Sequence, residues 1–464
     1  MPPGDLQQFI ELLLQHNLLT RISVPSDPVL EITAITDRIC KQPDGGPALL
    51  FDQPCGSRHR LATNLFGSPR RIALALGVPS LESLTERFAT LLNQIHQPEA
   101  ERLDQQIAGL PDFSRFTPHA SDEPLWTAED EHAGLSAFPF LHSWPDDGSA
   151  EGFPCYITLP QVFSALPDGS AVNCGMYRCQ IRGERELAIR WSDASGAARH
   201  LEAWRSSGKA MPVAIALGGP PATTFSAMLP LPGELDEMTF AGFLQDQPVA
   251  LSMCRTVPLR VPSTAEIVIE GLVEPDETVI EGPFGNHTGF YSPAGPAALL
   301  RVSSISCRPG AVVPATVVGP PPMEDCWMAK VWERLLLAIL RRYIPAIIDI
   351  HFPLEWTFHH SAIISLDKPE RGMVREIAGR LWQLPWFRSS RLTIFTDAAC
   401  TPADAPDLAW RCINLAGSVD DLFRDGAGAR LALDATGSLY DRIPVKPDPE
   451  IAARINQRWR EYGL

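Results

Sequence analysis

The spacing of hydrophobic and polar positions changes along the chain, and each pattern indicates a different kind of structure. Behind Asp5, a residue type that caps helices, apolar residues recur every three or four positions, which predicts an amphipathic helix from Leu6. From 47 to 66 short apolar runs alternate with Gly and Pro turns, and from 81 to 95 the helical spacing returns. These patterns predict a small N-terminal α/β domain, followed by a polar stretch from 98 to about 130.

Between 155 and 306 the chain consists of many short apolar segments separated by Pro and Gly. Examples are the segments 213–217, 249–251 and 267–269. Such spacing is typical of a β-barrel or β-sandwich rather than of alternating strands and helices. The sequence therefore predicts a β-rich central domain.

Helical spacing marks the C-terminal third of the chain. A predicted helix carries apolar residues from 331 to 339 and stops before Pro345. Strand-like segments at 362–366 and 392–395 flank a predicted helix over 373–384, which indicates a βαβ unit. Asp448 followed by Pro449 begins a last helix, with Ile451, Ile455 and Trp459 on one face. This third is therefore predicted to be α/β.

Composition and charge narrow the function classes. The chain has 464 residues with 39 Lys+Arg and 55 Asp+Glu, a net charge of -16, which argues against a basic nucleic-acid-binding protein. This length suggests two or three domains of about 100 to 200 residues each. The longest apolar stretch, 335–350, is interrupted by two arginines and a proline and is too short for a membrane span. We expect a multidomain enzyme without a membrane span.

The first residues and the cysteines bear on location. The start of the chain lacks the basic segment and uninterrupted apolar run of a secretory signal. The 10 cysteines include no Cys-x-x-Cys pair, which fits reduced thiols better than a disulfide framework or a zinc site. We therefore expect a cytoplasmic protein.

Most common catalytic motifs are missing from the sequence, including the dinucleotide-binding, phosphate-loop, nucleophile-elbow and His-Glu-x-x-His patterns. His359 and His360 could bind a metal, but neighbours on a strand point to opposite faces, which favours a structural or surface role. In 281–289, glycines and a proline shape a turn that carries a carboxylate, an amide and an imidazole. Such a turn is either a loop that holds functional groups near a ligand or a hairpin with a solvated polar tip. Asn173 precedes Arg178 by five residues, which would place them on opposite faces of a strand unless a bulge intervenes.

Together these segments resemble the UbiD family of carboxy-lyases, which use prenylated flavin mononucleotide. The resemblance covers nearly the whole chain and rests on ordered matches at 46–51, 64–67, 173–178, 189–191, 240–242, 258–262, 265–270, 281–285, 287–289 and 433–436. It implies an α/β multidomain (α+β) fold. The expected parts are an N-terminal α/β domain (1–115), a central flavin-reductase-like split β-barrel that binds the cofactor (116–318), and a C-terminal α/β domain (319–464) that assembles homodimers or homohexamers.

The resemblance also implies roles for individual residues. Arg178 matches the active-site arginine that attracts the substrate carboxylate, and Glu281 matches the first carboxylate of the Glu-Arg-Glu set that pairs with it. Asn173 and Glu237 match ligands of a divalent metal, usually manganese, that bridges to the flavin phosphate; potassium is a further implied cation. Arg430 stands where the family has a phosphate-contacting lysine.

Two positions depart from the family pattern. The second catalytic carboxylate is replaced by Asn286, which cannot act as a general acid, so the proton would come from His287, Glu281 or an ordered water. The metal-binding histidine falls near Ala194, which leaves Asp193 or water to complete the metal site. A one-residue slip on a strand usually reverses a side chain's direction, so Asp193 would need a local shift.

Three functions agree with these observations. The favoured one is reversible, non-oxidative decarboxylation of an aromatic or α,β-unsaturated carboxylic acid, with cofactor supplied by a flavin prenyltransferase. The alternative is a catalytically degenerate UbiD paralogue that acts as a partner or regulatory subunit, because both departures affect chemistry. A third function, redox work with ordinary flavin or another phosphate-bearing ligand, rests on architectural analogy alone.

Overall fold

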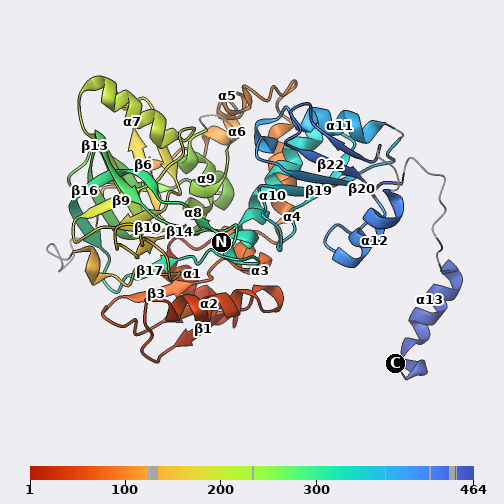
Figure 1. Ribbon diagram of the computed structural model, residues 1–464, viewed down its shortest axis with the longest axis horizontal. Helices are drawn as coiled ribbons and strands as arrows, with labels where there is room; N and C mark the ends of the chain where they lie inside the picture. The colour runs from red at the N-terminus through yellow and green to blue at the C-terminus, as the bar shows by residue number, and fades with distance from the viewer. Residues whose placement is uncertain are drawn as a thin grey trace.

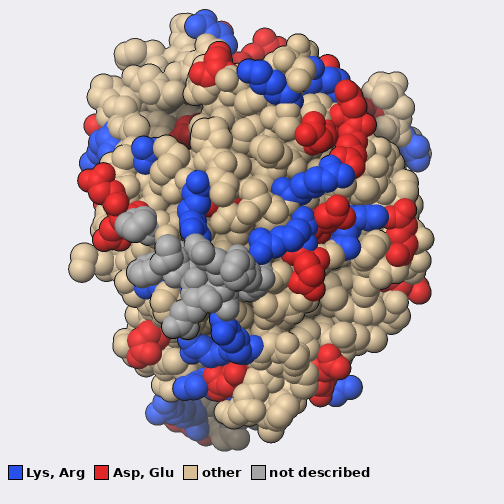
Figure 2. Space-filling model, turned by 90° about the vertical axis from the view of Figure 1, so that its left-hand side faces the viewer, with Lys and Arg blue, Asp and Glu red and all other residues tan. Residues whose placement is uncertain are grey.

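The computed structural model describes residues 1–123, 125, 134–231, 235–370, 372–416, 420–437, 445 and 447–463. In Figure 1 the central barrel lies beside the C-terminal sheet, with the N-terminal domain below the barrel and helix α10 (Glu324–Tyr343) between them. No helix within these residues is long and apolar enough to cross a membrane. On the face drawn in Figure 2, acidic and basic side chains are interspersed rather than separated by sign.

The N-terminal domain is built on a four-stranded sheet in the order β1-β2-β3-β17. Strands β1 (Leu19–Ile22), β2 (Ala48–Phe51) and β3 (Arg60–Thr63) come from this part of the chain. The predicted first helix is confirmed as α1 (Leu6–Gln15), whose cap Asp5 accepts a hydrogen bond from the Gln8 amide at 2.7 Å. The other helices here are α2 (Glu31–Cys40), η1 (Pro43–Gly45), α3 (Pro69–Leu76), α4 (Glu82–Leu92), α5 (Leu103–Ala108) and α6 (Pro111–Ser114).

Strand β17 (Val312–Ala315) was expected within the barrel segment but pairs in parallel with β3. The chain therefore returns from the barrel to complete the N-terminal sheet before it enters α10. A short apolar run of four residues predicts a strand but not the sheet to which the strand belongs. Here the run pairs with the edge of β3.

The central domain is an eight-stranded sheet in the order β5-β8-β9-β16-β13-β10-β6-β7. Its strands are β5 (Tyr156–Ile157), β6 (Gln161–Ala165), β7 (Val172–Gly175), β8 (Cys179–Ile181), β9 (Glu186–Ile189), β10 (Met211–Gly218), β13 (Ala265–Glu281) and β16 (Gly295–Cys307). Two small sheets adjoin it, made of β4 (His119–Ala120), β11 (Ala250–Met253) and β12 (Arg260–Pro262), and of β14 (Phe284–Gly285) and β15 (Tyr291–Ser292). The predicted split β-barrel, within an α/β multidomain fold, is confirmed.

Three helices of this domain were not predicted: α7 (Gly196–Ser207), α8 (Pro221–Met228) and α9 (Glu237–Gln245). A short 3₁₀ helix, η2, spans Leu135–Ala137. In α9 every residue after Glu237 is buried, and in α8 all residues but the last are buried. A helix buried on all sides has no polar face, so the helical period is invisible in its sequence.

The C-terminal domain confirms the predicted βαβ unit: β19 (Ser361–Leu366) and β20 (Leu392–Asp397) are parallel neighbours joined through α11 (Met373–Leu381). The five-stranded sheet has the order β18-β19-β20-β22-β21, with β18 (Ile347–His351), β21 (Leu422–Arg424) and β22 (Leu431–Asp434). The other elements are η3 (Pro385–Phe387), α12 (Ala405–Leu415), α13 (Pro449–Arg458) and η4 (Trp459–Tyr462).

The two expectations that placed site residues on strands were wrong. His359 and His360 lie in a turn that precedes β19, so strand alternation does not separate their side chains. Arg178 lies in the connection between β7 and β8, so its direction is not fixed by counting from Asn173 on β7.

Candidate active site

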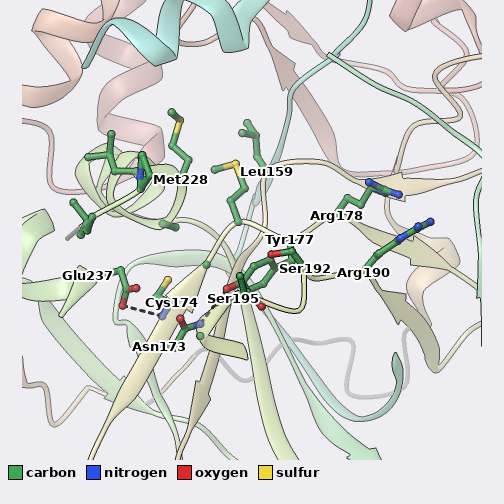
Figure 3. A pocket seen from close by; sticks show the side chains of 18 of the residues that line it. Leu159, Asn173, Cys174, Tyr177, Arg178, Arg190, Ser192, Ser195, Met228 and Glu237 are labelled. Carbon is green, nitrogen blue, oxygen red and sulfur yellow. Dashed lines mark hydrogen bonds between the residues drawn. The ribbon is translucent and has the colours of Figure 1, made fainter. Parts of the chain in front are cut away.

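A cavity of about 1060 Å³ lies where the barrel meets the C-terminal domain. Its wall comes from β7, the segment 176–178, the start of α7, the segment 227–231, the turn after β14 and the turn before β19. Five predicted site residues line it: Asn173, Arg178, Glu237, Asn286 and His287. In Figure 3, Asn173 and Glu237 lie on one side of this cavity and Arg178 and Arg190 on the other. The cavity thus has two chemically different ends.

Arg178 and Glu281 form a two-pronged ion pair, as the sequence led us to expect. The Arg178 Nε donates to Glu281 Oε1 at 2.7 Å, and its Nη2 donates to Oε2 at 2.9 Å. Both residues lie at strand ends of one sheet: Arg178 immediately precedes β8 and Glu281 is the last residue of β13, with β9 and β16 between the two strands. The paired edge leaves the Nη1 side of the guanidinium directed away from Glu281.

Arg190 is a second cation on Glu281 that the sequence reasoning did not single out. Its Nη1 donates to Glu281 Oε2 at 3.2 Å and to the Pro293 carbonyl at 2.9 Å. Because Cys179 pairs with Ile189 in the β8–β9 register, the preceding Arg178 and the following Arg190 end up opposite each other. A signal for this role was present, since Arg190 lies within the family-like segment 189–191.

Burial makes this cluster rigid. Glu281 is 0% exposed, and two guanidiniums balance its charge. The Arg178 guanidinium also lies over the Phe284 ring, 4.8 Å from its centroid. Burial and the Glu281 carboxylate raise the pKa of the Tyr156 hydroxyl, so this phenol stays protonated beside the cluster.

Asn173 and Glu237 supply oxygen atoms at the opposite end. The Glu237 carboxylate accepts a hydrogen bond from the Cys174 amide at 3.1 Å, which places it beside Asn173. The Asn173 Nδ2 lies 3.5 Å from the Tyr177 hydroxyl, which leaves the amide oxygen for other partners. Burial raises the pKa of Glu237 to about 8, although Arg199 and the Cys174 amide favour its charged form. A buried carboxylate of this kind suits a bound cation.

The N-terminus of α7 completes this end of the cavity. Ser195 caps α7 by accepting from the Ala198 amide at 3.2 Å, and Ser195, Gly196 and Arg199 all line the cavity. A Cβ on Gly196 would lie 1.9 Å from Asn173 Oδ1, so only glycine allows Asn173 to approach the helix so closely. A helix N-terminus with a nearby cation suits a phosphate group. The cavity and this end therefore fit a flavin mononucleotide.

The divalent metal has fewer protein ligands than the family pattern implies. Ala194 lines the cavity but has no donor atom, whereas Asp193 is exposed and is not part of the cavity wall. The structure therefore does not support Asp193 as a replacement ligand. Within the described residues no cluster of three or more His, Cys, Asp or Glu could hold a metal. Of the positions that the family pattern implies as metal ligands, Asn173 and Glu237 bring oxygen donors to the cavity wall.

Asn286 is held within its own turn. Its Nδ2 donates to the Ser292 hydroxyl at 2.7 Å, and its Oδ1 accepts from the His287 amide at 2.7 Å. The amide therefore shapes the turn that presents His287 to the cavity. Across the cavity wall, His359 Nε2 lies 3.5 Å from His287 Nε2. The sequence pattern favoured a structural or surface role for His359, because nothing in the linear sequence relates this residue to His287.

Two imidazoles here make the fold sensitive to acid. Burial, with nearby positive groups, lowers the pKa of His287 to about 4 and that of His359 to about 3. Below about pH 6.5, the ordinary value for histidine, the unfolded chain therefore binds more protons than the folded chain, and stability falls as the pH decreases toward 4.

Between pH 7 and pH 5, we expect the free energy of unfolding to fall by about 1 to 2 kcal/mol less in His287→Gln than in the wild type, because glutamine does not titrate. Urea unfolding at both pH values measures this difference, with His16→Gln, a change at an exposed histidine, as the control. An equal loss in the wild type and in His287→Gln would contradict the buried, neutral state of this imidazole.

Arg430 does not take part in this cavity, contrary to the sequence-based expectation. Its Nε donates to Asp425 Oδ2 at 2.8 Å, its Nη1 donates to the Trp382 carbonyl at 2.6 Å, and it does not line the cavity. Arg430 precedes β22, the neighbour of β20 in the C-terminal sheet, where these local partners hold it. Arg199 is a basic side chain that lines the cavity at the end formed by the α7 N-terminus, which suits a phosphate group.

Three family models match the chain in sequence order. They describe the N-terminal domain, the Rift-related domain and the C-terminal domain of 3-octaprenyl-4-hydroxybenzoate carboxy-lyase, UbiD, and match residues 10–91, 119–321 and 326–438. An uncharacterized protein of Aquifex aeolicus is 34% identical, over 99% of this chain and 99% of its own. One from Archaeoglobus fulgidus is 35% identical, over 88% of this chain and 83% of its own.

Solved structures share the fold. An evolved dimeric form of the UbiD-class enzyme HmfF from Pelotomaculum thermopropionicum, in complex with prFMN, matches with a TM-score of 0.81 and 23% identity over 97% of this chain and 98% of that one. Vanillic acid decarboxylase from Sedimentibacter hydroxybenzoicus, in closed form, matches with a TM-score of 0.81 and 22% identity over 98% and 99% of the two chains. Because family models match all three parts of the chain, the protein belongs to the UbiD family of carboxy-lyases.

Proposed function

We propose that this protein is a carboxy-lyase that reversibly decarboxylates an aromatic or α,β-unsaturated carboxylic acid with prenylated FMN. The observation that carries this proposal is the Arg178–Glu281 pair, with its carboxylate buried, at one end of a cavity large enough for a flavin and a small acid. The UbiD family models and the solved decarboxylases of the same fold support it.

Arg178 is the substrate-binding residue in this proposal. Glu281 fixes its Nε and Nη2 edge, so the Nη1 side is positioned for a substrate carboxylate without any rearrangement. A charge-assisted hydrogen bond at that point holds the acid in place while the bond to its carboxylate carbon breaks. The second cation, Arg190, donates to Glu281 Oε2 and helps to hold this carboxylate in the position that orients Arg178.

The opposite end would hold the cofactor. The α7 N-terminus and Arg199 would bind the phosphate, and Asn173 with Glu237 would contribute oxygen ligands to a divalent cation such as Mn²⁺. When bound, prenylated FMN supplies an electron sink for the electron pair that decarboxylation leaves behind. Because Ala194 contributes no ligand, water would have to fill its place; the potassium that the family pattern implies has no ligand set assigned here.

The proton for the product carbon would come from His287. Asn286 has no acidic proton to give, whereas its neighbour His287 lines the cavity and carries a titratable ring. Glu281 is fully buried, holds two arginines and does not line the cavity, so it does not face the product carbon. In this proposal Asn286 positions the turn, and the His287 imidazole donates the proton.

Cofactor content tests this function directly. The protein is produced together with a flavin prenyltransferase, purified in the dark without oxygen, and its released ligand is identified by mass and absorbance spectra. We expect prenylated FMN at one equivalent per chain, and carbon dioxide release from an aromatic or unsaturated acid. A folded, assembled protein without flavin would overturn the decarboxylase proposal.

One pair of observations favours a second candidate, a catalytically degenerate paralogue that serves a partner carboxylase. Both Ala194 and Asn286 lack the functional groups that the family pattern places there. This candidate predicts no bound flavin and no decarboxylation. The cofactor measurement therefore separates the two.

We also propose that the protein forms a homodimer or homohexamer, as its family resemblance implies. Helix α13 has no buried residue and stands apart from the rest of the chain in Figure 1. Trp459, which follows it, is 50% exposed, and Ile451 within it is 40% exposed. An apolar face so placed is an interaction surface.

We expect Trp459→Glu to convert the assembled protein to a smaller species, because a charge on this face opposes burial. Light scattering after size-exclusion chromatography measures the mass. Gln457→Glu, a change at an exposed polar position of α13, is the matched control. An unchanged mass in both variants would show that α13 does not hold the assembly together.

A further inference from the structure

His287 and His359 form an imidazole pair across the boundary between two domains. His287 lies in the turn between β14 and β15 of the central domain, and His359 in the turn before β19 of the C-terminal domain. Their Nε2 atoms lie 3.5 Å apart, their ring centroids 4.8 Å apart, and both residues line the cavity. We infer that the two rings share one proton and act together as the donor that replaces the acid missing at position 286.

The geometry allows the pair to carry one added proton but not two. When both rings are neutral, one Nε2 donates and the other accepts, so the two imidazoles must adopt opposite tautomers. One added proton converts a donor and an acceptor into an imidazolium hydrogen-bonded to an imidazole. A second would place two cations 3.5 Å apart in a part-buried wall, which their repulsion disfavours.

The surroundings of the pair keep it neutral until an anion arrives. Arg178 and His360 act on His287, and Arg391 and His360 act on His359, so each charged or titratable neighbour opposes a further positive charge. Phe358 covers part of His287, with 5.6 Å between the ring centroids. A carboxylate bound on Arg178 adds negative charge nearby and favours the protonated pair. The donor is therefore loaded when substrate is present.

The proposed step rests on the proposed function and balances as follows. Breaking the bond to the carboxylate carbon releases carbon dioxide and leaves the bonding electron pair with the product carbon. That electron pair then forms the new C–H bond with the shared proton, while the electrons of the N–H bond stay on nitrogen. The pair becomes neutral and takes up one proton from the solvent, so each turnover consumes one carboxylate and one proton and releases carbon dioxide and the protonated product. Because His359 belongs to the C-terminal domain, the donor is complete only while the two domains are in contact.

Nitrogen NMR on the full chain without cofactor tests the pair itself. In protein labelled with ¹⁵N-histidine at pH 7.5, we expect His287 and His359 to show opposite tautomers, one protonated at Nε2 and the other at Nδ1. His359→Phe should change the His287 shifts, whereas His16→Gln, a change at an exposed histidine of the N-terminal domain, should not. His287 shifts that are the same in the wild type and in His359→Phe would overturn the inference.

Kinetics on the flavin-loaded enzyme test the role. Removing a general acid typically costs about 10²- to 10⁴-fold, so we expect His359→Phe to lower kcat by at least about 100-fold. KM should change less than twofold, and the solvent deuterium isotope effect should rise as protonation becomes rate-limiting. The double variant His287→Phe/His359→Phe should be no slower than His287→Phe, because both rings serve one step.

Two further outcomes keep this test independent of the proposed function. His359→Gln, which retains a hydrogen-bonding side chain, should keep the fold but lose the alkaline limb of the wild-type pH profile. If the wild type decarboxylates and His359→Phe keeps its kcat and pH profile, the pair is not the donor. If the wild type binds prenylated FMN but decarboxylates no acid, the proposed function fails, and the NMR result alone decides whether the rings share a proton.

Discussion

Replacing Arg178 with lysine will lower the rate of decarboxylation by about 10²- to 10³-fold, the usual loss when one fixed charge-stabilising donor is removed from an active site. Lysine keeps the positive charge but lacks the planar fork that binds Glu281 with Nε and Nη2 at once. Its ammonium can pair with either Glu281 or the substrate carboxylate, but it has no second, prepositioned edge. Steady-state carbon dioxide release from the flavin-loaded variant measures the effect.

Arg182→Lys is the matched control for this experiment. Arg182 lies just after β8, donates to the Ile280 carbonyl at 2.9 Å and pairs with Glu151, and it does not line the cavity. This control should keep wild-type activity. Arg190 continues to balance Glu281 in Arg178→Lys, so the thermal unfolding of that variant should stay close to that of the wild type. Equal activity in the two variants would show that the two-pronged geometry of Arg178 is not needed.

An element with one buried and one exposed face leaves a clear period in the sequence, and α1 is an example. Helix α1 alternates Leu6, Phe9, Ile10 and Leu13 with polar positions, and its buried residues are these four. Helices α8 and α9 escaped prediction because they are buried nearly all round. A helical period of apolar residues arises when one face of a helix is buried and the other is in solvent. A helix that is buried on all sides lacks this period in its sequence.

The site divides along a similar line. Arg178 and Glu281 could be paired from the family resemblance, because each lies in a segment with a recognisable motif. His359 could not, because its relation to His287 depends on how the C-terminal domain meets the barrel. The expected role of Arg430 was inferred from a matching position in the sequence, but such a match does not fix a contact. Here local partners, Asp425 and the Trp382 carbonyl, hold the side chain away from the cavity.

The two ends of the cavity assign separate tasks to separate elements. The ends of β8, β9 and β13 provide a fixed cation at one end, whereas β7, α7 and α9 provide oxygen atoms and a helix N-terminus at the other. Both departures from the family pattern spare the Arg178 cluster: Asn286 removes an acid, and Ala194 removes a metal ligand. The end at which we propose that the substrate binds therefore stays intact, while the end proposed for the cation loses a ligand, so metal affinity is the property that a substitution could restore.

Ala194→His will raise the affinity for Mn²⁺ by at least about tenfold, because even partners that only support a metal ligand are worth about 10- to 100-fold in affinity. Ala194 lines the same cavity as Asn173 and Glu237, so an imidazole there adds a nitrogen ligand to two oxygen donors. Isothermal titration of the full chain with Mn²⁺, with and without FMN, measures the gain.

Asp193→His provides the control for this change, because it adds the same imidazole one residue away at an exposed position outside the cavity wall. It should leave Mn²⁺ affinity at the wild-type level. A gain in Ala194→His accompanied by higher prenylated FMN content would mean that the wild type lacks only this ligand, and that its fold still serves the cofactor. Equal Mn²⁺ affinity in both variants would mean that Asn173 and Glu237 do not form a cation site that an imidazole at position 194 can complete.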